Sequence, residues 1–187
     1  MRAVFVVAPE DFRDEELFVT RQVLEEAGAQ CVVASRTAGP CTGMHGGRAL
    51  ASIALDAVRV EAYDAVIFVG GQGARTYFDD AEAHRIATEA DASGKVLAAI
   101  CVAPTILARA GLLTGRKVTA YASELAGLGA AGAYVQHTSS VVPDGRLVTA
   151  DGPRVADEFA EAILRNARRG HRSATTQSLR GPRTGGR

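Results

Sequence analysis

The sequence predicts an α/β fold built on a doubly wound, mostly parallel sheet. Short runs of β-branched and small apolar residues recur along the chain, and amphipathic helical segments separate most of them. The order strand, helix, strand with short connections favours neighbouring parallel strands joined by right-handed crossovers. Ligands of such sheets bind at the carboxyl ends of the strands, so the residues that follow each strand are the candidates for a site.

The first third of the chain contains a strand-helix-strand unit. Residues 3–8 predict a buried strand, and residues 14–28 predict an amphipathic helix. A second strand is expected at residues 30–35. Residues 36–47, rich in Gly and Pro, predict a loop, and residues 48–55 predict a short strand or hairpin.

The middle of the chain repeats the alternation. Apolar runs predict buried strands at residues 65–69 and 96–100. Helical patterns follow them at residues 79–94 and 103–113, and residues 117–121 predict a further strand.

The last part of the chain changes in character. Two β-rich runs within residues 132–150 flank Pro143-Asp144-Gly145, which is typical of a hairpin. An amphipathic helix is expected at residues 153–170, with Pro153 at its start.

Composition fits one domain, which we assign to residues 1–170. The chain has 187 residues, 47% of them hydrophobic and 22% charged, which suffices for a sizeable core. Its formal net charge is zero, yet residues 171–187 hold arginines and no acidic residue. That segment lacks apolar periodicity, so we expect a disordered, solvated basic tail and no nucleic-acid partner.

Several features that the sequence lacks predict where the protein is found and that it binds no metal or cofactor. No apolar run approaches the roughly 18 residues of a membrane-spanning helix, and the N-terminal run is too short for a signal peptide. We therefore expect a cytoplasmic protein without membrane contact. The three cysteines have no CxxC spacing and no histidine pair has metal-ligand spacing, so we expect no disulfide framework, no metal and no cofactor.

Cys101 is the first candidate for chemistry. It directly follows the strand at residues 96–100 and precedes a helix that Pro104 opens. A residue at such a turn lies at the edge of the sheet, and the field of the helix N-terminus favours a thiolate and lowers the thiol pKa. An unpaired cysteine is also commonly a small core residue, so its position alone leaves both interpretations open.

Gly70 and Gly71 end the strand at residues 65–69. They form either a simple turn or a close backbone approach to a substrate oxygen, in which the N–H groups of Gly71 and Val102 make an oxyanion hole. A dinucleotide site fits poorly, because the last glycine of the GxGxxG motif is missing.

Three acidic residues open the first predicted helix. Most of them are expected to be solvated at the helix N-terminus, which is a stabilising position. Glu16 precedes the apolar residues 17–19, so we expect it to be partly buried with a raised pKa. The histidines are expected at the surface, and a role for His45 in "GMHGG" stays open.

Several motifs in order resemble one superfamily. They are Glu16 in the first helix, "GMHGG", "DAVIFVGG", "AAICVAPTILARAGLLTGRKVTAY" and "ADGP" before the final helix. Together they resemble the superfamily of PfpI-type intracellular proteases, ThiJ-like proteins and the parkinsonism-associated deglycase, which shares the fold of class I glutamine amidotransferases. The resemblance covers residues 1–169.

The resemblance implies a flavodoxin-like three-layer sandwich with a nucleophile elbow at Cys101. It further implies that Cys101 is the nucleophile, that Glu16 is a protonated carboxyl group hydrogen-bonded to the thiolate, and that Gly71 and Val102 supply backbone donors. Gly70 and Tyr121 complete the expected substrate-binding residues. Members are usually homodimers or higher homo-oligomers.

Three departures from the family's residue pattern reduce the number of activities that this sequence could have. Val102 stands where PfpI-type proteases carry a histidine, which argues against proteolysis. Tyr121 replaces the catalytic histidine of the deglycase branch, and a tyrosine is a poor base at neutral pH although it can donate a hydrogen bond. The His-x-Glu pair of the glutamine amidotransferases is absent from the sequence.

Two functions from different classes remain. The first is a lyase or hydrolase that acts on small reactive carbonyls, a glutathione-independent glyoxalase or deglycase that works through a Cys101 thiolate and Glu16. An isonitrile-hydratase-like enzyme or another specialised lyase or hydratase is the nearest enzymatic alternative. The second is a non-catalytic redox sensor or stress-protection protein in which Cys101 oxidises to the sulfinic acid.

Overall fold

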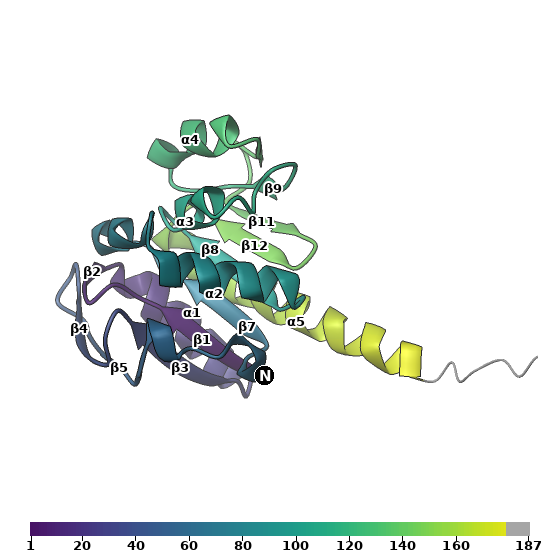
Figure 1. Ribbon diagram of the computed structural model, residues 1–187, viewed down its shortest axis with the longest axis horizontal. Helices are drawn as coiled ribbons and strands as arrows, with labels where there is room; N and C mark the ends of the chain where they lie inside the picture. The colour runs from purple at the N-terminus through teal and green to yellow at the C-terminus, as the bar shows by residue number, and fades with distance from the viewer. Residues whose placement is uncertain (179–187) are drawn as a thin grey trace, which may run out of the picture.

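A seven-stranded sheet forms the centre of the protein, with helices on both of its faces (Figure 1). The computed structural model describes the backbone of residues 1–178 and the side chains of residues 1–168. In spatial order the strands are β11 (Val141–Asp144), β12 (Leu147–Ala150), β8 (Val96–Ile100), β7 (Ala65–Phe68), β1 (Arg2–Val6), β3 (Gln30–Ser35) and β6 (Ile53–Ala54). Neighbouring strands are parallel except for the β11–β12 hairpin. The predicted doubly wound α/β fold is therefore confirmed.

Four helices form the two outer layers of the sandwich: α1 (Asp14–Glu26), α2 (Ala81–Ala92), α3 (Pro104–Arg109) and α5 (Ala156–Ser178). A further helix, α4 (Leu125–Ala130), packs against α3 away from the central sheet. Helices α1 and α5 pack against each other on one face of the sheet, and α2, with α3 beside it, covers the other face (Figure 1). Short 3-10 turns connect several elements: η1 (Leu55–Ala57), η2 (Val60–Ala62), η3 (Gln72–Tyr77), η4 (Ala122–Glu124) and η5 (Pro153–Val155).

The core lies on both faces of the three central strands. In β7 and β8 every residue is buried, and in β1 every residue is buried except Arg2. Strands covered by helices on both faces have no solvent-facing side, so their sequences are continuous apolar runs. Because side chains within these strands are buried, a ligand can be reached only by residues that follow the carboxyl ends of the strands.

Two small sheets lie beside the central one. Strands β2 (Glu10–Phe12), β4 (Gly39–Gly43) and β5 (Arg48–Ala51) form one, and β9 (Lys117–Val118) and β10 (Tyr134–Val135) form the other. Strand β4 lies inside residues 36–47, so the prediction of a loop there is wrong for that strand. Strand β4 pairs with β5, which follows it in the chain, and with β2, which is distant in the chain. The Gly and Pro content of the segment gives no indication of the pairing with a distant strand.

Two predicted elements are shorter in the structure. The helix expected at residues 103–113 is α3, which ends at Arg109 because Gly111 adopts a left-handed φ of 77° two residues later. The strand expected at residues 117–121 is only β9, and it pairs with β10 outside the central sheet.

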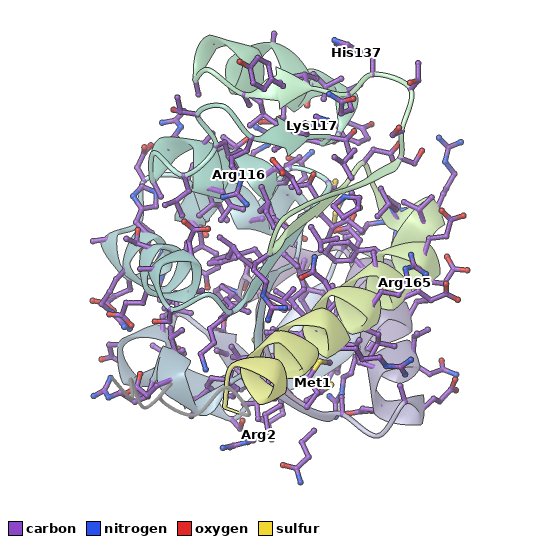
Figure 2. The ribbon with its side chains drawn as sticks, turned by 90° about the vertical axis from the view of Figure 1, so that its right-hand side faces the viewer. Met1, Arg2, Arg116, Lys117, His137 and Arg165 are labelled. Carbon is purple, nitrogen blue, oxygen red and sulfur yellow. The ribbon has the colours of Figure 1, made fainter. Side chains whose placement is uncertain are left out.

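The final helix differs from its expected boundary. Helix α5 begins at Ala156 after η5 and continues through Ser178, so it includes the first residues of the segment predicted to be a disordered tail. The rest of that segment, residues 179–187, lies outside the described residues. Figure 2 shows α5 crossing in front of the sheet, with Arg165 on it. Within residues 1–178, no helix combines the length and the apolar character that crossing a membrane requires.

Candidate active site

Cys101 occupies a strained turn between β8 and α3. Its φ of 63° lies in the left-handed region, which among the described non-glycine residues only Asp11 shares. Such strain persists where surrounding contacts impose it, and it is common at functional sites. The Cys101 N–H donates to the Ala150 carbonyl at 2.9 Å, and the Tyr121 N–H donates to the Cys101 carbonyl at 2.8 Å. The predicted elbow is thus held by two neighbouring chain segments.

Gly70 brings the end of β7 against this turn. A Cβ atom at Gly70 would lie 2.6 Å from Cys101 Cβ and 2.6 Å from Glu16 Oε2. No side chain fits there, which explains the first glycine of the pair. The Gly70 N–H donates a hydrogen bond to Glu16. Of the two glycines, Gly71 lines the cavity beside Cys101 and Gly70 does not.

Glu16 lies behind the thiol on helix α1 and is fully buried. Its Oε2 accepts the Gly70 N–H at 2.8 Å, while Oε1 is buried without a well-formed hydrogen bond in the part of the chain that the structure describes. Burial raises the pKa of this carboxyl group to about 7, against smaller opposing effects of the Gly70 amide and the Cys101 thiol. The group therefore holds or releases a proton near neutral pH.

Burial also raises the pKa of the Cys101 thiol, to about 12. The charge of Glu16 adds to this increase, and hydrogen bonds from the Gly71 and Val102 amides to the sulfur oppose it. The predicted lowering of the thiol pKa is wrong for a thiol that faces an ionised Glu16, because burial and this charge outweigh the field of a short helix. When Glu16 carries the proton its repulsion is absent, and the two amides then oppose the effect of burial alone.

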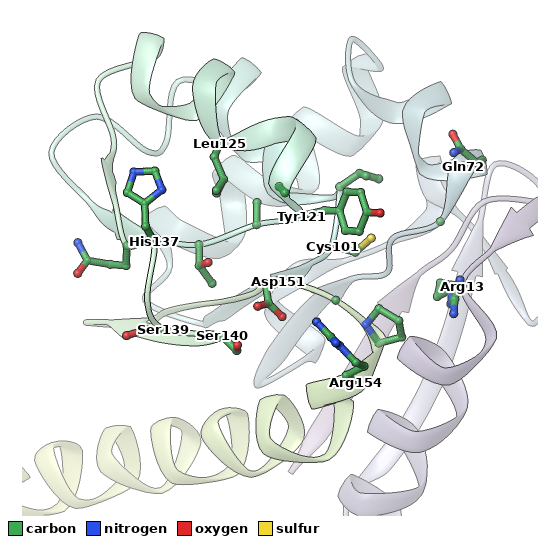
Figure 3. A pocket seen from close by; sticks show the side chains of 18 of the residues that line it. Arg13, Gln72, Cys101, Tyr121, Leu125, His137, Ser139, Ser140, Asp151 and Arg154 are labelled. Carbon is green, nitrogen blue, oxygen red and sulfur yellow. The ribbon is translucent and has the colours of Figure 1, made fainter.

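A cavity of about 650 Å³ opens in front of Cys101 (Figure 3). The predicted residues Gly71, Val102 and Tyr121 line it together with Cys101. Figure 3 shows the Tyr121 ring beside the sulfur atom. The structure thus brings the predicted site residues to one place, with Glu16 and Gly70 directly behind the thiol.

Sequence reasoning missed the charged side chains of this cavity, Arg13, Arg75, Asp151 and Arg154. Asp151 directly follows β12, so the rule that strand ends carry the site applies to it as it does to Cys101. No comparable signal exists for Arg75. Its partner Glu124 is 49 residues away in the chain, and only the fold brings the two together at 2.9 Å.

The histidines do not supply a base beside the thiol. His45 is absent from the cavity lining, and Nε2 of His84 lies 2.8 Å from the Phe78 carbonyl. His137 does line the cavity, but Figure 3 places it at the far end from Cys101, with Asp151 between them. The His171 side chain lies outside the described residues. Among those that are described, no group of His, Cys, Asp and Glu side chains is arranged to hold a metal ion.

The mostly parallel sheet between two helical layers, with Cys101 at the turn after β8, has the flavodoxin-like architecture of solved ThiJ/PfpI proteins. The model of the DJ-1/PfpI family matches residues 1–166, and the chain belongs to that family.

Three similar proteins support this assignment. A deglycase from Pyrococcus horikoshii is 36% identical over 121 residues, which are 65% of this chain and 72% of the deglycase. A glutathione-independent glyoxalase from Caenorhabditis elegans is 29% identical, covering 87% of this chain and 86% of the glyoxalase. The crystal structure of a ThiJ/PfpI domain protein from Brachyspira murdochii superposes with a TM-score of 0.88 at 29% identity, over 90% of this chain and 96% of that one.

Proposed function

We propose that the protein is a cysteine-dependent enzyme that acts on small reactive carbonyl compounds, with Cys101 as nucleophile and Glu16 as its proton-transfer partner. The observation that carries the proposal is the buried Glu16 carboxyl behind a cavity-facing thiol, with a pKa raised to about 7. A carboxyl group of that pKa gives and takes protons at neutral pH, which a glyoxalase reaction requires.

The first step is addition to an aldehyde such as methylglyoxal. Ionised Glu16 takes the Cys101 thiol proton as the sulfur forms a bond to the aldehyde carbon. The C=O π electrons move to oxygen, and that oxygen then takes the proton from Glu16 to give a hemithioacetal. The Gly71 and Val102 amides face the sulfur, which supports a role for them as donors to the developing oxyanion.

The second step moves a proton along the substrate. Ionised Glu16 removes the proton from the hemithioacetal carbon, and the neighbouring carbonyl carbon gains one, so that an enediol leads to a thioester of lactate. Water then hydrolyses the thioester, which releases lactate and the thiol. The sum is methylglyoxal plus water giving lactate, so no oxidant or cofactor is consumed.

The comparisons support this class of activity. Two similar proteins carry the names deglycase and glutathione-independent glyoxalase.

Turnover of methylglyoxal tests the proposal. We expect the purified protein to form lactate, and we expect C101S and E16Q each to lower the rate by at least about a hundredfold, the usual scale for losing a nucleophile or general acid-base group. C31S and E25Q are matched controls, since Cys31 on β3 and Glu25 on α1 do not line the cavity. Lactate formation that is equal in wild type and C101S would overturn the proposal.

A further inference from the structure

The arginines that line the cavity differ in whether a carboxylate pairs with them. Arg13 Nε lies 2.8 Å from Glu15 Oε2, and Arg75 Nη2 lies 2.9 Å from Glu124 Oε1. Neither Glu15 nor Glu124 lines the cavity. Two of the guanidinium groups that face the cavity are therefore already paired with carboxylates outside it.

Arg154 differs from both. It lies in η5, between β12 and helix α5, and lines the cavity with its side chain exposed. Across the described side chains, it forms no ion pair or side-chain hydrogen bond. Figure 3 shows its guanidinium group extending into the cavity beside Asp151. Asp151 lines the same wall and is likewise without an ion pair to any described side chain.

The cavity is also larger than a three-carbon carbonyl needs. Its volume of about 650 Å³ falls within the range of sites for whole metabolites. A substrate held only at Cys101 would leave the wall around Arg154 to water.

We propose that Arg154 binds a carboxylate group of the substrate, so that the protein prefers reactive carbonyl compounds that carry a carboxylate at a distance from the aldehyde. This inference rests on the proposed function of Cys101. A guanidinium group presents a planar pair of N–H donors that matches the two oxygens of a carboxylate, and no described side chain occupies these donors of Arg154. An example of the class is 4,5-dioxopentanoate, an oxoaldehyde to which the same reaction adds water to give 2-hydroxyglutarate.

Asp151 sets the side from which the carboxylate approaches. Its negative charge repels a carboxylate, so the bound group must contact Arg154 on the side away from Asp151. Removal of the two charges should consequently have opposite effects: loss of Arg154 weakens anion binding and loss of Asp151 strengthens it.

Alkylation of Cys101 tests the inference without any turnover. Iodoacetate and iodoacetamide react with a thiolate in the same way and have similar size, but only iodoacetate is an anion. We expect R154Q to lower the ratio of the two rates at Cys101 by about three- to tenfold, as for loss of one solvent-exposed charge-assisted contact, and D151N to raise it. The control R165Q, whose arginine is ion-paired with Glu161 on α5, should keep the wild-type ratio.

Steady-state kinetics then connect this site to a substrate. In R154Q the KM for 4,5-dioxopentanoate should rise by a larger factor than the KM for methylglyoxal. An iodoacetate to iodoacetamide ratio that is the same in R154Q and wild type would overturn the role of Arg154, even if carbonyls are turned over. A ratio that falls in R154Q while neither carbonyl is consumed would instead overturn the proposed function and retain Arg154 as an anion-binding residue.

Discussion

The Gly70 amide donates to Glu16 Oε2 at 2.8 Å, and this bond joins the end of a core strand to the acid behind the Cys101 thiol. It occupies one carboxylate oxygen and leaves Oε1, fully buried, without a well-formed bond within the described residues. A buried carboxyl group with one such oxygen is best accommodated when it carries a proton. The backbone of the core thus prepares Glu16 as a proton store beside Cys101.

Glu16 should make the stability of the fold depend on pH. Its pKa is about 7 in the folded protein and 4.5 as an ordinary group, so between these values unfolding releases a proton. The contribution to stability is complete below pH 4.5 and is lost as the pH rises through 7, by about 3 kcal/mol for a shift of this size. Denaturant unfolding should show E16Q gaining stability relative to wild type across this window, and E25Q following wild type. A constant difference between E16Q and wild type would contradict the raised pKa.

The same proton should shape the reactivity of the thiol. Below pH 7 the Glu16–Cys101 pair holds two protons, and above it one proton is shared, so the fraction of thiolate rises up to about pH 7 and then levels off. The rate of Cys101 alkylation by iodoacetamide should follow this curve. In E16Q the inflection near pH 7 should disappear and the rate should keep rising, because the thiol then titrates alone. An unchanged inflection in E16Q would assign it to another group.

Gly70→Ala should damage the site more than the fold. The new methyl group would meet Cys101 Cβ and Glu16 Oε2 at 2.6 Å and the Ile100 carbonyl at 2.8 Å. We expect a loss of about 1–3 kcal/mol in stability, typical of overpacking, and a loss of carbonyl turnover. Gly127→Ala on α4 is the matched control, since its Cβ would meet nothing within 4 Å and its loss of glycine favours a helix. Wild-type turnover in G70A would show that this close approach is dispensable.

The central sheet and the elbow were predictable because both rest on local patterns. The apolar runs of β7 and β8 identify buried strands, and the residue that follows a parallel strand lies at the site edge. The apolar residues after Glu16 predicted that its side chain is partly buried, and in the structure it is fully buried.

What was not predictable depends on long-range contacts. The thiol pKa depends on Glu16, 85 residues earlier in the chain, and no local pattern gives the sign of their interaction. Asp14 illustrates the same limit, because it was expected to be a solvated acid and is buried. Its oxygens accept from the His45 and Gly47 amides, and a helix-start pattern does not reveal that partner.

Asp14→Asn should loosen the turn between β4 and β5. Asp14 Oδ2 accepts the His45 N–H at 2.8 Å and Oδ1 accepts the Gly47 N–H at 2.7 Å, whereas an asparagine can accept only one of these bonds. A cost of about 1–3 kcal/mol is expected for the amide left unpaired, together with faster hydrogen exchange at residues 45 and 47. The turn carries Met44, which lines the cavity, so KM should rise more than kcat falls. D56N, at an exposed position in η1, is the control, and equal exchange rates in D14N and wild type would refute the role of Asp14.

Glu124→Gln should change both the stability and the charge of the cavity. Glu124 accepts bonds from Arg75 at 2.9 Å, Thr105 at 2.9 Å and Ser123 at 2.7 Å, and these contacts lower the pKa of the carboxyl group against the effect of burial. The lowered pKa means that this stabilisation is present above pH 4.5 and is lost as the pH falls through the folded value. E124Q should therefore be less stable than wild type at neutral pH by about 1–2 kcal/mol, and the difference should shrink in acid.

Loss of the Glu124 charge also leaves Arg75 without its carboxylate partner at the cavity wall. The ratio of iodoacetate to iodoacetamide alkylation at Cys101 should consequently rise in E124Q, the opposite of the change expected in R154Q. E89Q removes the charge of an exposed carboxylate paired with Arg85 on α2, away from the cavity, and should leave both the ratio and its salt dependence unchanged. A ratio that stays at the wild-type value in E124Q would show that the positive charge of Arg75 does not affect the reaction of Cys101 with an anionic reagent.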